Sequence, residues 1–151
     1  MNLSRPYKTN VNKITLFREP STIEKTKISC SRDIEAFSRQ MYGNTISILE
    51  DFYIVCLNNS NIIEDFVHIS RGGITGTLVD IRILAKIALE SLSVGVILVH
   101  NHPSGTLIPS QADKNLTQKV KKALGYFDIK ILDHLILTEN SYFSFADENI
   151  L

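Results

Sequence analysis

The feature that most constrains the fold of this 151-residue chain is an apolar run that ends in two histidines and a proline. Residues 94–99, Val-Gly-Val-Ile-Leu-Val, carry no polar side chain and are typical of a buried β-strand. His100 and His102 follow directly. Because side chains two positions apart on a strand point to the same face, both imidazoles can reach one metal ion. Pro103 ends the strand, since proline has no N–H to donate to a neighbouring strand.

A carboxylate from the next predicted helix completes this candidate site. The chain turns at residues 104–105, Ser-Gly, and a helix is expected to start at Ser110. Asp113 lies in its first turn and can bring a carboxylate back to the two histidines. Two histidines, one carboxylate and an open fourth position are the ligand set of a catalytic zinc site, not of a structural one. We therefore predict one Zn²⁺ per chain, held by His100, His102 and Asp113.

The same residues have a second, purely structural interpretation. Ser110 followed three residues later by Asp113 is also a helix-capping arrangement, with serine as N-cap and an acid near the third helical position. A single histidine in an apolar strand is usually a core residue. The pair at the strand end, directly before proline, favours metal binding. Ser110 can cap the helix and still face the site, so the two interpretations are compatible for that residue.

The spacing His-x-His, seven residues, Ser, two residues, Asp resembles the JAMM motif, also called MPN+ or JAB, of zinc metalloproteases. Residues 99–113 resemble the bacterial RadC branch of that superfamily. So do Leu-Asp-His-Leu at 132–135 and residues 142–148. The resemblance covers residues 45–151. It implies an α/β fold in which helices flank a mixed central β-sheet, the JAMM fold, which is similar to that of cytidine deaminases.

The resemblance also implies a general base and a reaction. In the family, a glutamate at the start of an upstream strand accepts a proton from the zinc-activated water. Glu50 precedes the apolar residues 52–57 and matches that position, whereas Asp51 is the alternative if the register is shifted by one residue. Ser110 is implied to donate a hydrogen bond to the developing oxyanion. The implied reaction is hydrolysis of a peptide or isopeptide bond in a peptide or protein substrate.

The rest of the chain has a mixed α/β pattern. Strands are expected at residues 13–18, 27–29, 52–57, 62–69, 94–99, 129–137 and 142–145, and helices at 31–43, 80–92 and 111–124. Ser31 and Asp80 are expected N-caps, Leu92 is expected on a buried helical face, and Gly125 is expected just past a helix end. Two parts are expected. Residues 1–44 form an N-terminal extension whose short strands and helix pack on the core, and residues 45–151 form the JAMM-like domain.

Other polar residues carry weaker signals. Asp133 and His134 are adjacent on a predicted strand and so point to opposite faces, which favours packing roles, although either residue could support the metal site. His68 receives no role. The glycine-rich residues 71–76 lack the lysine of a phosphate-binding loop and are expected to form a turn near the site. Five lysines between residues 114 and 130 are expected to form a solvated helix face, with a weak phosphate-contacting patch as the lesser interpretation.

The composition limits the classes of binding partner that are expected. Apolar residues make up 44% of the chain, charged residues 21%, and the net charge is zero, so no bulk attraction to nucleic acid or to a membrane surface is expected. No apolar run is long enough to span a membrane, and the N-terminus lacks the apolar core of a signal peptide. The expected location is therefore the cytoplasm. Cys30 and Cys56 are expected to be reduced core thiols.

Three functions compete. The first, which we expect, is a zinc-dependent metallohydrolase, a peptidase or isopeptidase. The second is a DNA-repair-associated factor, as the RadC name suggests, that binds nucleic acid or repair proteins without proteolysis. The third is a metal-stabilised binding module without turnover. Zero net charge and the absence of the helix-hairpin-helix segment of longer RadC proteins weigh against tight nucleic-acid binding. A nucleobase deaminase is disfavoured because its His-x-Glu and Pro-Cys-x-x-Cys signatures are absent.

Overall fold

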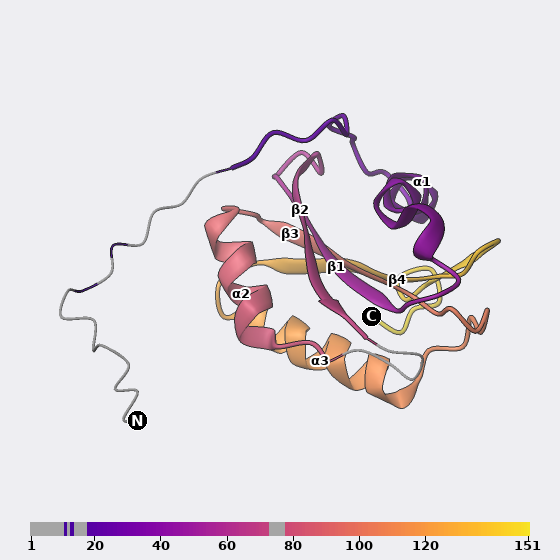
Figure 1. Ribbon diagram of the computed structural model, residues 1–151. Coiled ribbons are helices and arrows are strands. Elements are labelled where there is room, and N and C mark those ends of the chain that lie inside the picture. The colour runs from indigo at the N-terminus through magenta and orange to yellow at the C-terminus, as the bar shows by residue number, and fades with distance from the viewer. Residues whose placement is uncertain (1–10, 12, 14–17, 73–77) are drawn as a thin grey trace, which may run out of the picture.

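A five-stranded mixed β-sheet of strand order β2-β1-β3-β4-β5 forms the centre of the computed structural model, which describes residues 11, 13, 18–72 and 78–151 (Figure 1). The strands are β1 Asp51–Leu57, β2 Ile63–Arg71, β3 Gly95–Asn101, β4 Lys130–Leu137 and β5 Tyr142–Ser144. The helices are α1 Ser31–Tyr42, α2 Ile81–Glu90 and α3 Gln111–Gly125, with a short 3₁₀ helix, η1 Gly43–Thr45, after α1. β3 and β4 pair in parallel, and the other neighbours pair antiparallel. The predicted α/β class with a mixed central sheet flanked by helices is confirmed.

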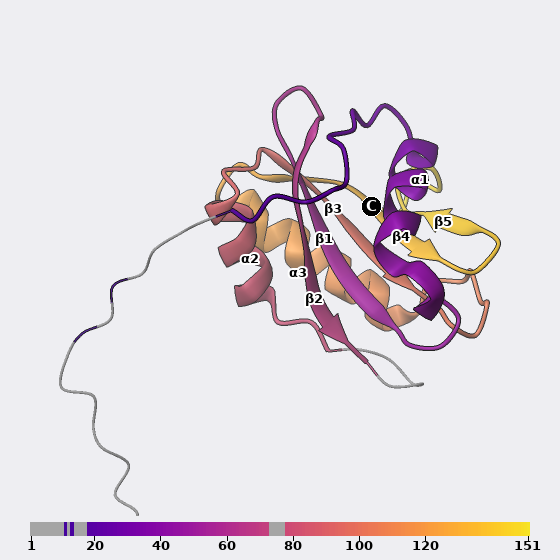
Figure 2. The same cartoon turned by 45° about the horizontal axis from the view of Figure 1, so that its top comes forward.

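Helices cover both faces of the sheet. α2 and α3 lie side by side on one face, and α1 lies on the other (Figures 1 and 2). Along β3, Val96 and Leu98 belong to the apolar cluster under α2 and α3, while Ile97 and Val99 belong to the cluster under α1. Because both faces are covered, every residue of β1 and β3 is buried. This is why both strands are nearly continuous apolar runs in the sequence instead of alternating patterns.

The connection from β3 to α3 brings the histidines and the carboxylate to one edge of the sheet. After β3, the His102 N–H donates to the Leu137 carbonyl at 2.8 Å, which holds this turn against the end of β4. Gly105 then adopts φ +82°, a left-handed conformation that favours glycine. α3 begins with a capping box in which the Ser110 side chain accepts from the Asp113 N–H and the Asp113 carboxylate accepts from the Ser110 N–H. The predicted cap is therefore present.

The predicted elements from residue 31 onward are present, with shifts of one or two residues at their ends. Asp80 caps α2 as predicted, accepting from the Arg82 N–H. The strand predicted at 27–29 is reduced to a single bridge between Lys27 and Ile62. Of the strand predicted at 13–18, residues 14–17 lie outside the described residues, as do residues 73–76 of the predicted glycine-rich turn.

Three predicted helix ends were wrong. Cys30, not Ser31, is the N-cap of α1, and the Ser31 hydroxyl instead donates to Asp147 at 2.6 Å. Leu92 lies beyond the end of α2 and is 83% exposed, because the chain reverses there with φ +54° to enter β3. Gly125 belongs to the last turn of α3, whose C-cap is Tyr126, and the left-handed residue is Asp128. The last two ends are set by where the next strand must pair, which helical periodicity does not encode.

Across the described residues, no helix combines the length and the apolar character needed to cross a membrane.

Candidate metal centre

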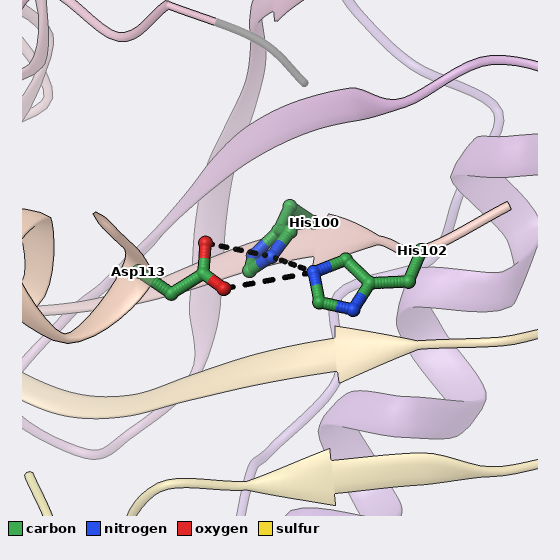
Figure 3. Close-up of side chains that lie close together, drawn as sticks. All are labelled: His100, His102 and Asp113. Carbon is green, nitrogen blue, oxygen red and sulfur yellow. Dashed lines mark hydrogen bonds and ion pairs between the residues drawn. The ribbon is translucent and has the colours of Figure 1, made fainter. Parts of the chain in front are cut away.

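His100, His102 and Asp113 converge beyond the C-terminal end of β3, where α3 begins (Figure 3). The two Nε2 atoms lie 3.0 Å apart. Asp113 Oδ1 is 3.3 Å from His100 Nε2, and Asp113 Oδ2 is 3.6 Å from His102 Nε2. The His100 side chain is 1% exposed, whereas those of His102 and Asp113 are each 15% exposed. The three ligand atoms thus face one point that is reachable from solvent on one side.

These distances fit a tetrahedral ion. Zinc binds nitrogen and oxygen ligands at about 2.0–2.2 Å, so neighbouring ligand atoms around a tetrahedral zinc are about 3.3–3.5 Å apart. The observed separations of 3.0, 3.3 and 3.6 Å bracket that value. The donor set of two imidazoles and one carboxylate is also the one that leaves a fourth position open. His100, His102 and Asp113 are therefore the residues that would hold zinc.

Without a metal, the cluster is held together by charge. Burial raises the pKa of Asp113, but hydrogen bonds from His100 and His102 outweigh this effect and hold the pKa well below its usual range. The pKa of His102 is raised, chiefly by its hydrogen bond to Asp113, and the charge of Glu50 adds to that rise. The carboxylate is thus ionised and ready to bind a cation, while a proton on His102 competes for the same position.

Glu50 lies on the metal side of the sheet, directly before β1. β1 pairs with β3 so that Phe52 is opposite His100, and their rings stack with centroids 5.7 Å apart. Directly opposed residues of antiparallel strands share a face. Extending this register by two residues puts Glu50 opposite His102, on the same face as both histidines. The contribution of Glu50 to the pKa of His102 agrees with this placement.

Asp51, the alternative base, is on the other face and has different partners. It accepts two hydrogen bonds from Arg71, at 2.7 and 3.0 Å, and contacts His68 Nε2 at 2.7 Å. Its side chain is 1% exposed. Burial alone would raise the pKa of Asp51, but the bonds from Arg71 and His68 outweigh it and the pKa is lowered. Asp51 is therefore part of an ion pair that ties the start of β1 to the end of β2.

Asn101, between the two histidines, ties the end of β3 to the Glu50 segment. Its Oδ1 accepts from the Asp51 N–H at 2.8 Å. Its Nδ2 donates to the carbonyls of Ile46 and Leu49 at 2.6 and 2.8 Å. The residue is fully buried. Together with the pairing of β1 on β3, this side chain sets the position of Glu50 relative to the histidines.

The Ser110 hydroxyl is engaged within the cluster. It donates to Asp113 Oδ2 at 2.7 Å and accepts from the Asp113 N–H at 3.1 Å. A hydrogen bond from this hydroxyl to a reacting oxygen therefore requires it to rotate away from the carboxylate. Ser110 is exposed, which leaves room for that rotation.

Two further residues contact the cluster, and the sequence pattern indicated their roles only weakly. His134, for which packing was favoured, places Nε2 2.8 Å from His100 Nδ1. Thr117 Oγ1 lies 2.7 Å from His134 Nδ1. Burial lowers the pKa of His134 well below its usual value, and the charge of His100 adds to this effect, so the ring is neutral. A histidine within an apolar strand parallel to the His-x-His strand was the only available signal.

The sheet between helices, with two histidines and an aspartate at its edge, defines a protein of the JAB/MPN class. A family model described as "RadC-like JAB domain" matches residues 28–150, so the match includes α1. The chain belongs to the RadC-like JAB domain family.

Curated relatives support this assignment. A UPF0758 protein of Flavobacterium johnsoniae is 46% identical over 133 residues, which cover 88% of this chain and 57% of that protein. A UPF0758 protein of Porphyromonas gingivalis is 43% identical, over 68% of this chain and 45% of that protein. The UPF0758 protein YeeS of Escherichia coli is 41% identical, over 68% of this chain and 69% of that protein. The chain thus spans about half the length of the first two relatives, and none of the three names states an activity.

Proposed function

We propose that this chain is a zinc-dependent metallohydrolase, a peptidase or isopeptidase that uses a metal-activated water. The observation that carries the proposal is the convergence of His100 Nε2, His102 Nε2 and Asp113 on one solvent-accessible point at tetrahedral spacing. A bound zinc would act as a Lewis acid toward an amide carbonyl and would lower the pKa of a coordinated water to about 7. Membership of the JAB family supports a hydrolase but does not specify which type of bond is hydrolysed.

Glu50 is the proposed general base. A carboxylate beside the site can accept the proton of the attacking water and then deliver it to the departing nitrogen. The register of β1 on β3 supports Glu50, because it shares the face of His100 and His102. Asp51 lies on the opposite face, and Arg71 already occupies both of its oxygens. These contacts weigh against Asp51 in that role.

Ser110 is the proposed hydrogen-bond donor to the oxygen of the amide that develops charge during attack. Such a donor stabilises the transition state most when it is already close to that oxygen. The Ser110 hydroxyl is 2.7 Å from Asp113 Oδ2, at the edge of the candidate site. Zinc would draw charge away from that carboxylate, which would weaken its hold on the hydroxyl.

The test measures metal and cleavage together. Protein purified without added metal is expected to contain one zinc per chain by elemental analysis. The His100→Ala/His102→Ala double variant should lose most of it, and His68→Ala, which removes a histidine outside the cluster, should keep it. A peptide-library digest should show cleavage that a chelator abolishes and added zinc restores. Full zinc content in the double variant would show that the ligands are misassigned.

A further inference from the structure

A chain of buried hydrogen bonds links two of the candidate zinc ligands behind the site. His100 Nδ1 lies 2.8 Å from His134 Nε2, and His134 Nδ1 lies 2.7 Å from Thr117 Oγ1. The Thr117 hydroxyl in turn donates to the Asp113 carbonyl at 2.7 Å. His134 and Thr117 are fully buried, and His100 is 1% exposed. Solvent therefore does not reach this series of hydrogen bonds, and its side chains cannot bond to water instead of to one another.

The direction of these hydrogen bonds follows from what each atom can do. The Asp113 carbonyl can only accept, so it takes the single hydrogen of the Thr117 hydroxyl. Thr117 Oγ1 then accepts from His134 Nδ1–H. A neutral imidazole carries one proton, so His134 Nε2 is an acceptor and receives the hydrogen of His100 Nδ1. In the neutral His100 ring, Nε2 therefore carries the lone pair, which faces the candidate metal position, whereas a hydrogen bond from Nε2 to Asp113 forms only while the ring carries a second proton.

A single hydrogen bond holds His102 in the same tautomer. Its Nδ1 lies 2.8 Å from the Thr106 carbonyl, which can only accept. Nδ1 therefore carries a proton, and Nε2 is the atom left to bind a metal. The two candidate ligands thus receive matching tautomers from different elements: α3 and β4 act on His100, and the turn after β3 acts on His102.

Ring stacking fixes the orientation of the buried pair. Phe145 stacks on His134 with ring centroids 4.7 Å apart, and Phe52 stacks on His100. Asp133 holds the turn that carries Phe145, since it accepts from the Ser144 hydroxyl and the Ala146 N–H at 2.6 and 3.0 Å. The His134 ring therefore has little freedom to flip its two nitrogens.

We propose that His134 and Thr117 are positioning residues that hold His100 as its Nδ1–H tautomer, with Nε2 ready for the metal before it arrives. This inference rests on the proposed zinc site. Partners of this kind behind a histidine ligand typically change metal affinity by about 10–100-fold when they are removed. The expected contribution of Thr117 and His134 lies in that range.

The first experiment reads the tautomers directly in the metal-free protein. Imidazole ¹⁵N chemical shifts distinguish a protonated nitrogen from one with a lone pair, and at alkaline pH the rings are neutral. His100, His102 and His134 are each expected as the Nδ1–H form. If His100 and His134 are both protonated on Nε2, His134 donates to His100 and the hydrogen bonds run in the reverse direction. That result would overturn the proposal. This result does not depend on whether the protein cleaves anything.

The second experiment measures Zn²⁺ affinity by competition with a chromophoric chelator. Thr117→Val removes the hydroxyl while keeping the size of the side chain, and it should weaken zinc binding by about 10–100-fold. Thr117→Ser keeps the hydroxyl and should restore affinity to within a fewfold of the wild type. Thr138→Val is the matched control, because Thr138 is also buried but its hydroxyl bonds only within the turn at residues 138–141, and it should bind zinc like the wild type.

The outcomes separate this inference from the proposed function. Unchanged zinc affinity and unchanged His100 shifts in Thr117→Val would refute the positioning role, even in an active enzyme. A wild-type protein that binds zinc but cleaves no peptide would refute the proposed hydrolase and leave the positioning role standing. If Thr117→Val folds poorly, the Thr117→Ser comparison and the wild-type ¹⁵N shifts still decide the direction of these hydrogen bonds.

Discussion

At the residue scale, the contrast between Glu50 and Asp51 shows how one position decides the role of a carboxylate. The two residues are adjacent, yet β-strand geometry sends their side chains to opposite faces. Asp51 is buried beneath the more exposed side chains of Arg71 and His68, and Arg71 neutralises its charge. Glu50 shares the face of the histidines, and its charge adds to the rise in the pKa of His102. The identity of the side chain matters less here than the face that it occupies.

Glu50→Gln is therefore expected to keep zinc and the fold while lowering hydrolysis by about 10²–10⁴-fold, the usual cost of a lost general base. Zinc content and single-turnover cleavage measure the two effects separately. Asp51→Asn is the matched comparison, and it should lower the free energy of unfolding because it leaves Arg71 without its carboxylate. Normal turnover in Glu50→Gln would remove Glu50 from the mechanism.

A second residue-scale prediction concerns pH. The pKa of His102 is raised by its hydrogen bond to Asp113, so His102 holds its proton to a higher pH than the ordinary histidine value of about 6.5. Zinc must displace that proton. Its affinity should therefore fall as pH falls through this raised pKa, by about tenfold per pH unit for one proton. Competition titrations across this range test the slope, and His68→Gln should leave it unchanged.

The metal-free protein should show the opposite trend. The His102–Asp113 pair contributes stability that is fully present below the unfolded histidine pKa, and that stability is lost as pH rises through the raised pKa of His102. Added zinc should thus reverse the contribution of this pair to the pH dependence of Tm. Equal shifts of Tm with and without zinc at every pH would contradict the assignment of His102 as a ligand.

At the element scale, the site depends on how three elements meet. β3 supplies the histidines, the first turn of α3 supplies Asp113, and the segment before β1 supplies Glu50. The capping box at Ser110 fixes the start of α3, so Asp113 serves both as a cap partner and as a candidate ligand. Asn101 fixes the third element, because its amide bonds join the end of β3 to the residues before β1.

Asn101→Ala should destabilise the protein by about 2–4 kcal/mol, because it removes the partner of the buried Asp51 N–H and of the carbonyls of Ile46 and Leu49. Urea unfolding measures this loss. Asn140→Ala, in an exposed turn, should stay within about 0.5 kcal/mol of the wild type. The folded fraction of Asn101→Ala should bind zinc but hydrolyse poorly, since Glu50 is no longer held. A stability equal to that of the wild type would show that the Asn101 hydrogen bonds are dispensable.

At the scale of the whole molecule, the charge distribution bears on the competing DNA-binding function. The net charge is zero, and one group of exposed lysines follows α3 and the start of β4: Lys114, Lys119, Lys121, Lys122 and Lys130. One of them, Lys121, donates to the Leu151 carbonyl at 3.1 Å. A narrow row of lysines on an otherwise balanced surface releases few counterions from a duplex. A surface of this kind weighs against tight binding of nucleic acid.

We accordingly expect only weak, non-specific duplex binding by this chain, with a Kd of about 10⁻⁴ M or weaker at physiological salt. Fluorescence anisotropy with duplex and single-stranded DNA across a salt series tests this expectation. The peptide-library digest run beside it provides the comparison. Submicromolar DNA affinity at physiological salt, with no cleavage of any peptide, would put the nucleic-acid role first.

Local sequence determined the order of elements and most of the candidate site. Apolar runs located β1 and β3, and the spacing of His100, His102 and Asp113 predicted a cluster that the fold brings together. These features are readable because strand alternation, helix capping and proline act over a few residues. The helix ends near Leu92 and Gly125 were less predictable, since each depends on the strand that follows, and the N-cap predicted at Ser31 lies one residue earlier, at Cys30.

Only the tertiary structure decided which distant side chains meet. The parallel pairing of β3 with β4 brings His134 behind His100, although 34 residues separate them. The packing of α3 on β4 then places Thr117 against His134. The antiparallel register of β1 on β3 put Glu50, rather than Asp51, on the face of the histidines. Hydrogen-bond partners across strands are set by register and burial, which are properties of the assembled sheet and not of any segment alone.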